Sequence, residues 1–262
     1  MERPSNIPGE TSIILNDFQM GRLRRILKDF EMQSKNFGGK ILTIHSLVWF
    51  FGEIIAGFRR KRIPVTHVYL VGGAASFIAN GHNLYNDIDV VFKIGGGNVP
   101  DERVEKKILD SVKDVVFNVL RYVMRKAKLH HFNDALRDSF IAKKSLVFDA
   151  NSQDSWSLIA FNNVKGDNLE IKTSIRMRRE FQFASDSLQI DLMPMINRTA
   201  GPVRMISSFG NVHQTLTILK EKRIETWNPE EIIGGGLYKY CLLKSTGFKD
   251  PKNPMSRKQL HQ

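Results

Sequence analysis

The feature that most constrains this chain is a strand that ends in paired glycines and runs directly into a helix. Residues 65–71 are apolar and rich in β-branched side chains, which predicts a strand, and Gly72 and Gly73 follow at once. Residues 74–79 then have helical composition and end at an Asn-Gly-His-Asn stop signal. A second apolar run starts at about Asp87, so the predicted order is strand, helix, strand.

The two ends of this unit carry chemistry that belongs together. Backbone N–H groups at the glycines, and the positive end of the helix after them, suit a triphosphate. Asp87 and Asp89 fall on one face of the second strand, roughly 6 to 7 Å apart at about 3.3 Å per residue, and such a pair favours a divalent metal. Either motif alone is more often a plain turn or a chance surface pattern. Their order and spacing favour a joint phosphate and metal site.

A third carboxylate is expected from a neighbouring strand, because phosphoryl transfer assisted by two metal ions commonly uses three. The candidates are Glu170, Asp186 and Asp191. Glu170 is best placed, because it lies between apolar Leu169 and Ile171 on a predicted hairpin strand and would face the open side of a sheet. Carboxylates gathered this closely repel one another unless a cation lies between them, which again indicates Mg²⁺.

The net charge indicates the kind of partner. The 262 residues carry a formal net charge of +12, with a pI near 9.8, which favours a polyanion such as RNA. The alternative is a basic surface that serves solubility. The densest basic run, residues 59–62, lies where cations favour a helix C-terminus, and it also resembles a nuclear-import signal. We favour the helix-end interpretation, because short basic runs are frequent.

The expected location is the cytoplasm, with the nucleus as an alternative. Cys241 is the single cysteine, so no internal disulfide can form, and the first residues lack the apolar run of a signal peptide. The most apolar stretch, residues 47–58, is interrupted by Glu53 and is shorter than the about 20 residues needed to cross a bilayer. We therefore expect a reducing compartment and no membrane span.

The rest of the pattern predicts an α+β fold in which helices flank a mixed sheet. Apolar residues recur at helical spacing over residues 101–128, and an earlier helix is expected at about 40–60. The pattern turns helical after residue 210, which predicts a catalytic domain over 1–205 and the start of a helical nucleotide- or RNA-binding domain over 206–262. Further strands are expected at residues 145–148, 155–161 and 169–172 and in the first half of 180–195.

Several blocks of sequence, spread from about residue 15 to residue 248, resemble one family. In chain order they are KRIPVTHVYLVGGAASFI, YNDIDVVF, DSWSLIAFNN, NLEIK, RREFQFASDSLQI and NPEEIIGGGLYKYC. They are similar to terminal nucleotidyltransferase family 5, a group of eukaryotic poly(A) polymerases of the nucleotidyltransferase fold, which has a palm like that of DNA polymerase beta. Because independent blocks agree in their order, the resemblance is specific.

The resemblance implies an RNA adenylyltransferase that adds AMP from ATP to RNA 3′ ends, those of mRNA above all, with Mg²⁺ or Mn²⁺ as cofactor. It matches Asp87 and Asp89 with the family's metal-binding pair. It matches Glu170 with the third acidic residue at the metals, which orients the RNA 3′-hydroxyl or helps to deprotonate it. Gly72 and Gly73 match the triphosphate-binding motif.

The chain departs from the family pattern at the glycine turn and at its C-terminus. Relatives usually carry Gly-Ser where this chain has Gly72-Gly73, so a hydroxyl donor to the phosphates is missing; Ser76 is a candidate replacement, against the plainer interpretation of a helix N-terminal serine. Lys239 is a candidate phosphate contact, although a surface lysine is about as common. Relatives also continue well beyond Cys241 with more helices, which predicts a chain shortened at its C-terminus.

Three functions remain open from the sequence alone. The leading one is the addition of AMP to RNA 3′ ends by Asp87, Asp89 and Glu170. The second is a catalytically impaired short form that binds RNA or a protein partner. The third keeps the chemistry and moves it to a protein acceptor, because the motif specifies nucleotide transfer and not its recipient. The net charge of +12 favours RNA.

Overall fold

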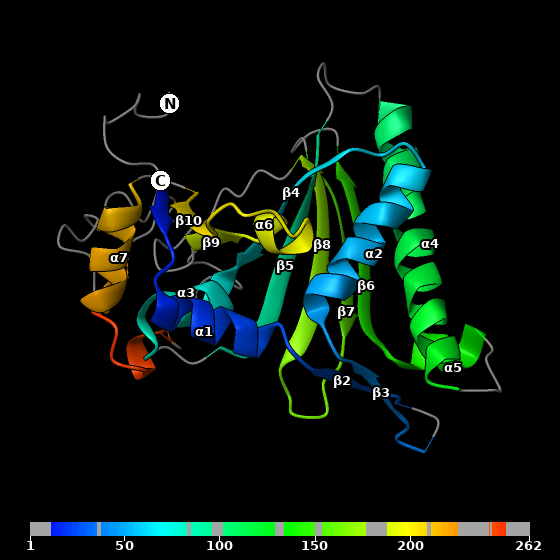
Figure 1. The fold of residues 1–262 in the computed structure, drawn as a ribbon, viewed down its shortest axis with the longest axis horizontal. Helices are drawn as coiled ribbons and strands as arrows, with labels where there is room; N and C mark the ends of the chain where they lie inside the picture. The colour runs from blue at the N-terminus through cyan, green and yellow to red at the C-terminus, as the bar shows by residue number, and fades with distance from the viewer. Residues whose placement is uncertain are drawn as a thin grey trace.

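The protein is built around one large sheet whose strands come from distant parts of the chain (Figure 1). The computed structural model describes residues 12–35, 38–82, 85–95, 102–128, 134–149, 154–176, 188–208, 211–224, 241 and 243–249. Within these ranges the sheet has eight strands in the order β1-β10-β9-β4-β5-β8-β7-β6. The strands are β1 (Ser12–Ile14), β4 (Val65–Val71), β5 (Asp87–Ile94), β6 (Ile141–Asp149), β7 (Asp154–Phe161), β8 (Asn168–Arg176), β9 (Leu188–Asp191) and β10 (Arg204–Ser207).

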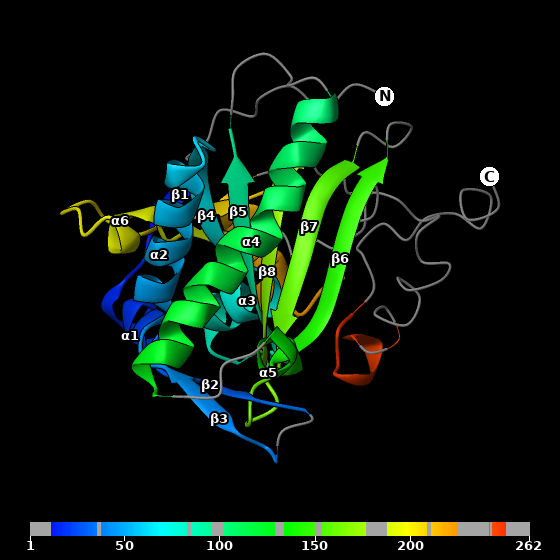
Figure 2. The ribbon, with the colours of Figure 1, turned by 90° about the vertical axis from the view of Figure 1, so that its right-hand side faces the viewer.

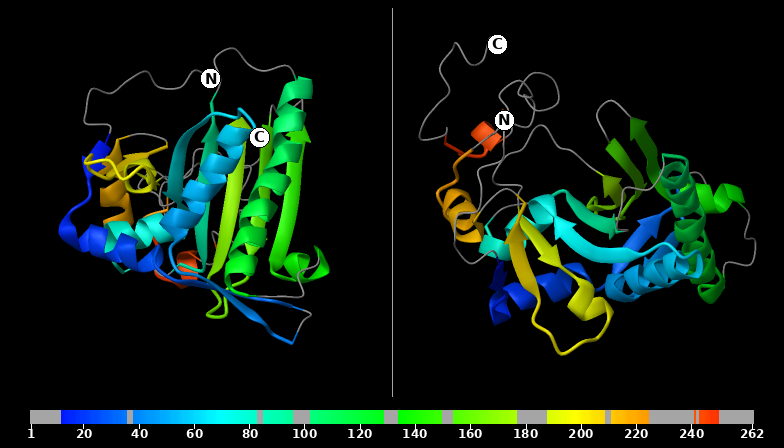
Figure 3. Two further views of the ribbon diagram at one scale, coloured as in Figure 1. Left: turned by 45° about the vertical axis from the view of Figure 1, so that its right-hand side comes forward. Right: turned by 90° about the horizontal axis from the view of Figure 1, so that it is seen from above.

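Helices flank this sheet, and the two longest lie on the same face of it. All the views show α2 and α4 running along one face (Figures 1, 2 and 3). None of the described helices is both long and apolar enough to cross a membrane. The mixed sheet with its flanking helices confirms the predicted α+β class. The helices are α1 (Asp17–Ile26), α2 (Leu47–Arg60), α3 (Gly72–Asn80), α4 (Glu102–Lys126), α5 (Asp134–Ser139), α6 (Met193–Ile196) and α7 (Val212–Lys220).

The core between α2 and the sheet fixes the orientation of strand β5. Phe92 of β5 meets Phe51 and Phe58 of α2, with ring centroids 5.8 and 6.4 Å apart, and all three side chains are buried. Phe92 lies three residues after Asp89, and alternate residues of a strand point to opposite faces. The Asp89 side chain therefore lies on the face of the sheet that α2 does not cover.

Residues 40–60 do not form one helix as predicted. Ile41–Ile44 is strand β3, which pairs in antiparallel register with β2 (Phe30–Gln33) in a separate two-stranded sheet. The helix begins only at Leu47, because the Ser46 hydroxyl accepts a hydrogen bond from the backbone N–H of Trp49 and caps the first turn. The prediction was wrong because strand pairing is non-local, whereas the apolar pattern over 40–60 is also compatible with a helix.

The other predicted strands at 145–148, 155–161 and 169–172 lie within β6, β7 and β8, which confirms them. The first half of 180–195 lies outside the described residues, and β9 follows it. Strand β10 pairs with β9 and β1, and α7 contacts both α3 and β10. The division between 1–205 and 206–262 stays a prediction.

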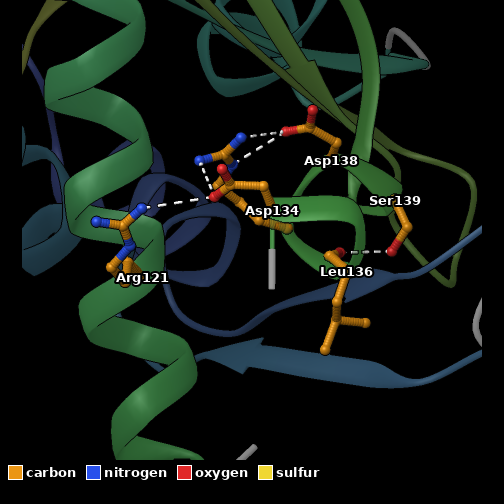
Figure 4. Close-up of polar contacts among 6 residues, drawn as sticks. Arg121, Asp134, Leu136, Asp138 and Ser139 are labelled. Atoms are coloured by element: carbon orange, nitrogen blue, oxygen red, sulfur yellow. Dashed lines mark hydrogen bonds and ion pairs between the residues drawn. The ribbon is translucent and has the colours of Figure 1, made fainter. Parts of the chain in front are cut away.

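An ion-pair cluster attaches the short helix α5 to α4 (Figure 4). Asp134 lies 2.8 Å from Arg137 and 3.5 Å from Arg121 of α4, measured from Oδ1 to guanidinium nitrogens. Arg137 also pairs with Asp138 at 2.9 Å and lies over the Phe117 ring at 4.2 Å. The Arg137 side chain is only 10% exposed, so these contacts replace the water it gives up.

Candidate active site

Two neighbouring parallel strands place two carboxylates side by side. In the β5–β8 pairing, Asp89 is the direct partner of Glu170, and Asp87 is the partner of Asn168. Both carboxylates lie at the same level of the sheet and on the same face, because their positions are in register. The predicted approach of Glu170 to the aspartate pair therefore agrees with the strand order.

Asp191, the alternative third acid, lies elsewhere on the sheet. It belongs to β9, which is separated from β5 by β4, and its direct partner is Tyr69. Its carboxylate accepts a hydrogen bond from the backbone N–H of Met193 at 2.9 Å and lies 3.8 Å from His67 Nδ1. The Asp191 carboxylate therefore already serves as a hydrogen-bond acceptor at the start of α6. Asp186, the remaining candidate, lies outside the described residues.

The predicted phosphate-binding turn adjoins Asp89. Val71, the last residue of β4, is the cross-strand partner of Asp89, and Gly72 begins α3 immediately afterwards. Gly72 has a φ of +68°, and a Cβ placed on it would lie 3.0 Å from Asp89 Oδ2. Val71 provides no side-chain hydrogen bond to the start of α3, so the N–H groups of its first turn can serve a ligand.

The two other predicted phosphate contacts cannot be placed in this turn. Ser76 lies further along α3 and is buried, with 3% of its surface exposed. Lys239 lies outside the described residues. The candidate triphosphate site is therefore built from the backbone of Gly72 and Gly73, while the roles of Ser76 and Lys239 stay predictions.

Lys172 is the site residue that the sequence reasoning missed. Its Nζ lies 2.5 Å from Asp89 Oδ1 and 3.1 Å from Glu170 Oε2, so the ammonium group bridges the two carboxylates. The signal was present in the sequence as Glu-Ile-Lys, which puts Lys172 on the same face as Glu170. It looked like an ordinary alternation of charged residues, because only the pairing with β5 brings Asp89 within reach.

Burial raises the pKa of the Glu170 carboxyl above its ordinary value. The Lys172 ammonium acts in the opposite direction by favouring the charged form, while the negative charge of Asp89 raises the pKa further. Desolvation is the largest of these effects. The Glu170 carboxyl therefore accepts a proton more readily than it would in water.

Replacing Glu170 with glutamine is expected to raise the melting temperature at neutral pH. Because its pKa is higher in the folded than in the unfolded chain, the folded protein binds more protons between the two values, and stability falls as pH rises through that window. Glutamine cannot ionise, so the substitution removes the free-energy cost of burying an ionised carboxylate. Thermal melts of both proteins in EDTA, at about pH 4 and pH 7.5, measure it: the advantage should vanish at the lower pH. An advantage confined to the acidic sample would contradict the assignment.

The oxygen donors at this site suit a hard divalent cation. Within the part of the chain that the structure describes, no group of three His, Cys, Asp or Glu side chains is close enough to hold a metal as it stands. Asp87 and Asp89 share one strand face, however, and Glu170 lies beside Asp89. Carboxylate oxygens are the ligands that Mg²⁺ and Mn²⁺ prefer, and the Lys172 ammonium marks a position that already holds positive charge. Asp87, Asp89 and Glu170 therefore fit a divalent cation such as Mg²⁺ or Mn²⁺.

Replacing Gly72 with alanine is expected to reduce both stability and catalysis. The backbone at φ +68° costs about 1–2 kcal/mol for a residue with a Cβ, and this Cβ would also press on Asp89. Gly21→Ala is the matched control, because no atom lies within 4 Å of a Cβ at that position of α1. Thermal melts and nucleotide incorporation measure the two effects. A Gly72→Ala protein as active as Gly21→Ala would show that the turn does not shape the site.

Comparison with known proteins defines the class. A family model described as "Nucleotidyltransferase" matches residues 15–262, nearly the whole chain. Terminal nucleotidyltransferase 5D of Homo sapiens is 38% identical over 200 residues, which cover 71% of this chain and 50% of that protein. Terminal nucleotidyltransferase 5B of Xenopus tropicalis is 31% identical over 214 residues, covering 77% and 52%. Terminal nucleotidyltransferase 5C of Gallus gallus is 29% identical over 271 residues, covering 98% and 66%.

The chain therefore belongs to this nucleotidyltransferase family, and within it to terminal nucleotidyltransferase family 5. The predicted palm, with its mixed sheet and flanking helices, agrees with that membership. The chain spans about half the length of the 5D and 5B relatives.

Proposed function

We propose that this protein transfers AMP from ATP to the 3′ end of RNA. The observation that carries the proposal is the direct pairing of Asp89 with Glu170, on the sheet face where the Gly72 turn adjoins Asp89. A nucleotidyl transfer needs acidic groups and a triphosphate cradle at one place, because the reaction is mostly positioning and charge neutralisation. The neighbouring positions of Gly72, Asp89 and Glu170 support the proposal that both functions are combined here.

In the proposed reaction, the RNA 3′-oxygen forms a bond to the α-phosphorus of ATP, and the bond from that phosphorus to the bridging oxygen of pyrophosphate breaks. The backbone N–H groups of Gly72 and Gly73 hold the triphosphate at the positive end of α3. Pyrophosphate leaves with the electron pair of the broken bond. The proton of the 3′-hydroxyl is released as the new bond forms.

We assign Glu170 as the general base that accepts this proton. A general base works best when its pKa approaches the working pH, and burial shifts Glu170 in this direction. Its place opposite Asp89 also lets it orient the hydroxyl toward the phosphate. Glu170 thus orients the acceptor and can take its proton at a carboxylate oxygen.

Asp87, Asp89 and Glu170 would hold Mg²⁺ or Mn²⁺. When bound, the cation supplies charge stabilisation at the attacking and leaving oxygens. The remaining contribution of the chain is geometric: β5 and β8 hold the three carboxylates on one rigid sheet face, fixed from behind by the packing of Phe92 on α2.

Two observations support RNA as the acceptor. The formal net charge of +12 favours a phosphate-rich partner, because Lys and Arg that neutralise phosphates release bound counterions. The relatives are named terminal nucleotidyltransferases, a name that describes transfer to an end. An RNA 3′ end satisfies both. The choice of adenine follows from the resemblance of the sequence motifs to poly(A) polymerases.

The test is incorporation of each labelled nucleotide, one at a time, into a short oligo(A) RNA with Mg²⁺. We expect the wild type to extend the RNA most strongly with ATP, and the double variant Asp87→Asn plus Asp89→Asn to bind RNA without extending it. Transfer of label to protein with no extension of RNA would favour the protein acceptor. RNA binding without transfer by either protein would favour the impaired binding form.

A further inference from the structure

We propose that Lys172 is a built-in counter-cation of the site: its ammonium group holds Asp89 and Glu170 when no divalent metal is bound, and the metal has to displace it. This inference rests on the proposed function for the identity of the metal ligands. It assigns Lys172 a positioning role, and a measurement of metal affinity can test that role.

The geometry of the ammonium group carries the inference. Lys172 Nζ is 2.5 Å from one oxygen of Asp89 and 3.1 Å from one oxygen of Glu170. The three side chains are 15%, 20% and 23% exposed, respectively, so the contact is largely shielded from water. Two carboxylates this close to one cation are held together by it, since they would otherwise repel each other.

The side chains beside Lys172 on the two neighbouring strands cannot accept a hydrogen bond from its ammonium group. Lys172 pairs with Val91 on β5 and with Leu158 on β7, and both of these residues are buried and apolar. A lysine stem packs well along apolar neighbours while its charged end seeks polar partners. The ammonium group therefore contacts the carboxylates of Asp89 and Glu170.

The position of the ammonium group conflicts with a bound divalent cation. A metal ion binds carboxylate oxygens at about 2.0–2.1 Å for Mg²⁺, so at these same oxygens it would lie next to a second positive charge. One of the two cations must leave. If Lys172 occupies the carboxylates in about nine of ten metal-free molecules, it weakens the apparent metal affinity about tenfold.

Binding of Mn²⁺ to the full chain, followed by electron paramagnetic resonance without nucleotide, tests the competition. Lys172→Met keeps an unbranched stem and removes the charge, so it should bind Mn²⁺ about tenfold more tightly than the wild type. Lys172→Arg keeps the charge and should bind no more tightly than the wild type. Unchanged or weaker Mn²⁺ binding by folded Lys172→Met would overturn the inference.

Asp89→Asn separates this inference from the proposed function. If wild-type Mn²⁺ binding does not depend on Asp89, the metal ligands of the proposed function are wrong. If binding depends on Asp89 while Lys172→Met binds like the wild type, only the counter-cation role fails.

A second measurement uses the wild type alone and covers the case in which Lys172→Met does not fold. An amine-reactive reagent modifies free lysine ammonium groups after deprotonation, and mass spectrometry reports the rate at each lysine. Saturating Mg²⁺ should raise the labelling rate of Lys172 severalfold, because the displaced amine leaves its carboxylate partners. Exposed Lys128 is an internal reference whose rate should not change. A rate at Lys172 that stays constant or falls would overturn the inference.

Discussion

Replacing Asp89 with asparagine is expected to lower nucleotide incorporation by about 10³-fold. Asparagine keeps the size of the side chain but removes the negative charge that faces Glu170 and adjoins Gly72. Metal binding and charge stabilisation depend on that charge, whereas the fold depends on the strand pairing around it. Single-turnover extension of a labelled RNA measures the loss, and circular dichroism checks that the variant is folded.

Asp191→Asn is the matched control for this experiment. Asp191 lies on the same sheet but on β9, where it caps the start of α6 through the Met193 N–H, a role that asparagine can also fill. We expect its activity to stay within about threefold of the wild type, because asparagine can keep the hydrogen bond to Met193 and β4 separates this position from β5. Equal losses in both variants would mean that net charge, rather than the β5–β8 site, controls the reaction.

Replacing Phe92 with alanine is expected to cost about 3–5 kcal/mol of unfolding free energy. The Phe92 ring is fully buried between Phe51 and Phe58, and its removal leaves a cavity directly behind the strand that carries Asp87 and Asp89. Urea denaturation measures the change. Because β5 contributes to the core and also carries the proposed metal ligands, the loss of packing should also reduce activity at temperatures where the variant is still folded.

Phe18→Ala is the control for the removal of a phenyl ring. Phe18 is 81% exposed in α1, so its replacement should change the unfolding free energy by less than about 0.5 kcal/mol. A small effect at Phe92, comparable to that at Phe18, would contradict the packing that holds β5 against α2.

The strand, glycine turn, helix and second strand could be predicted because each depends on local sequence. The period-2 alternation placed Asp87 and Asp89 on one face, and Glu170 was chosen over Asp191 because of its apolar neighbours. The strand order agrees with that choice: β8 adjoins β5, and β9 does not.

The features that the sequence did not predict depend on pairing between distant segments. Lys172 contacts Asp89 only because β8 pairs with β5. The two residues are 83 positions apart in the sequence, so local patterns could not predict this contact. Strand β3 likewise exists because residues 30–33 pair with it, although its own residues also fit a helical pattern. Local periodicity therefore identified the candidate residues, and the register between distant strands decided which of them lie side by side.

The most direct test of the central claim is a crystal structure of the protein with Mn²⁺ and a non-hydrolysable ATP analogue, with metal positions taken from anomalous scattering. We predict an anomalous peak at the carboxylates of Asp87 and Asp89, with the triphosphate at the backbone of Gly72 and Gly73. Metal and triphosphate bound at another surface, with Lys172 still bridging Asp89 and Glu170, would contradict the assignment of this site.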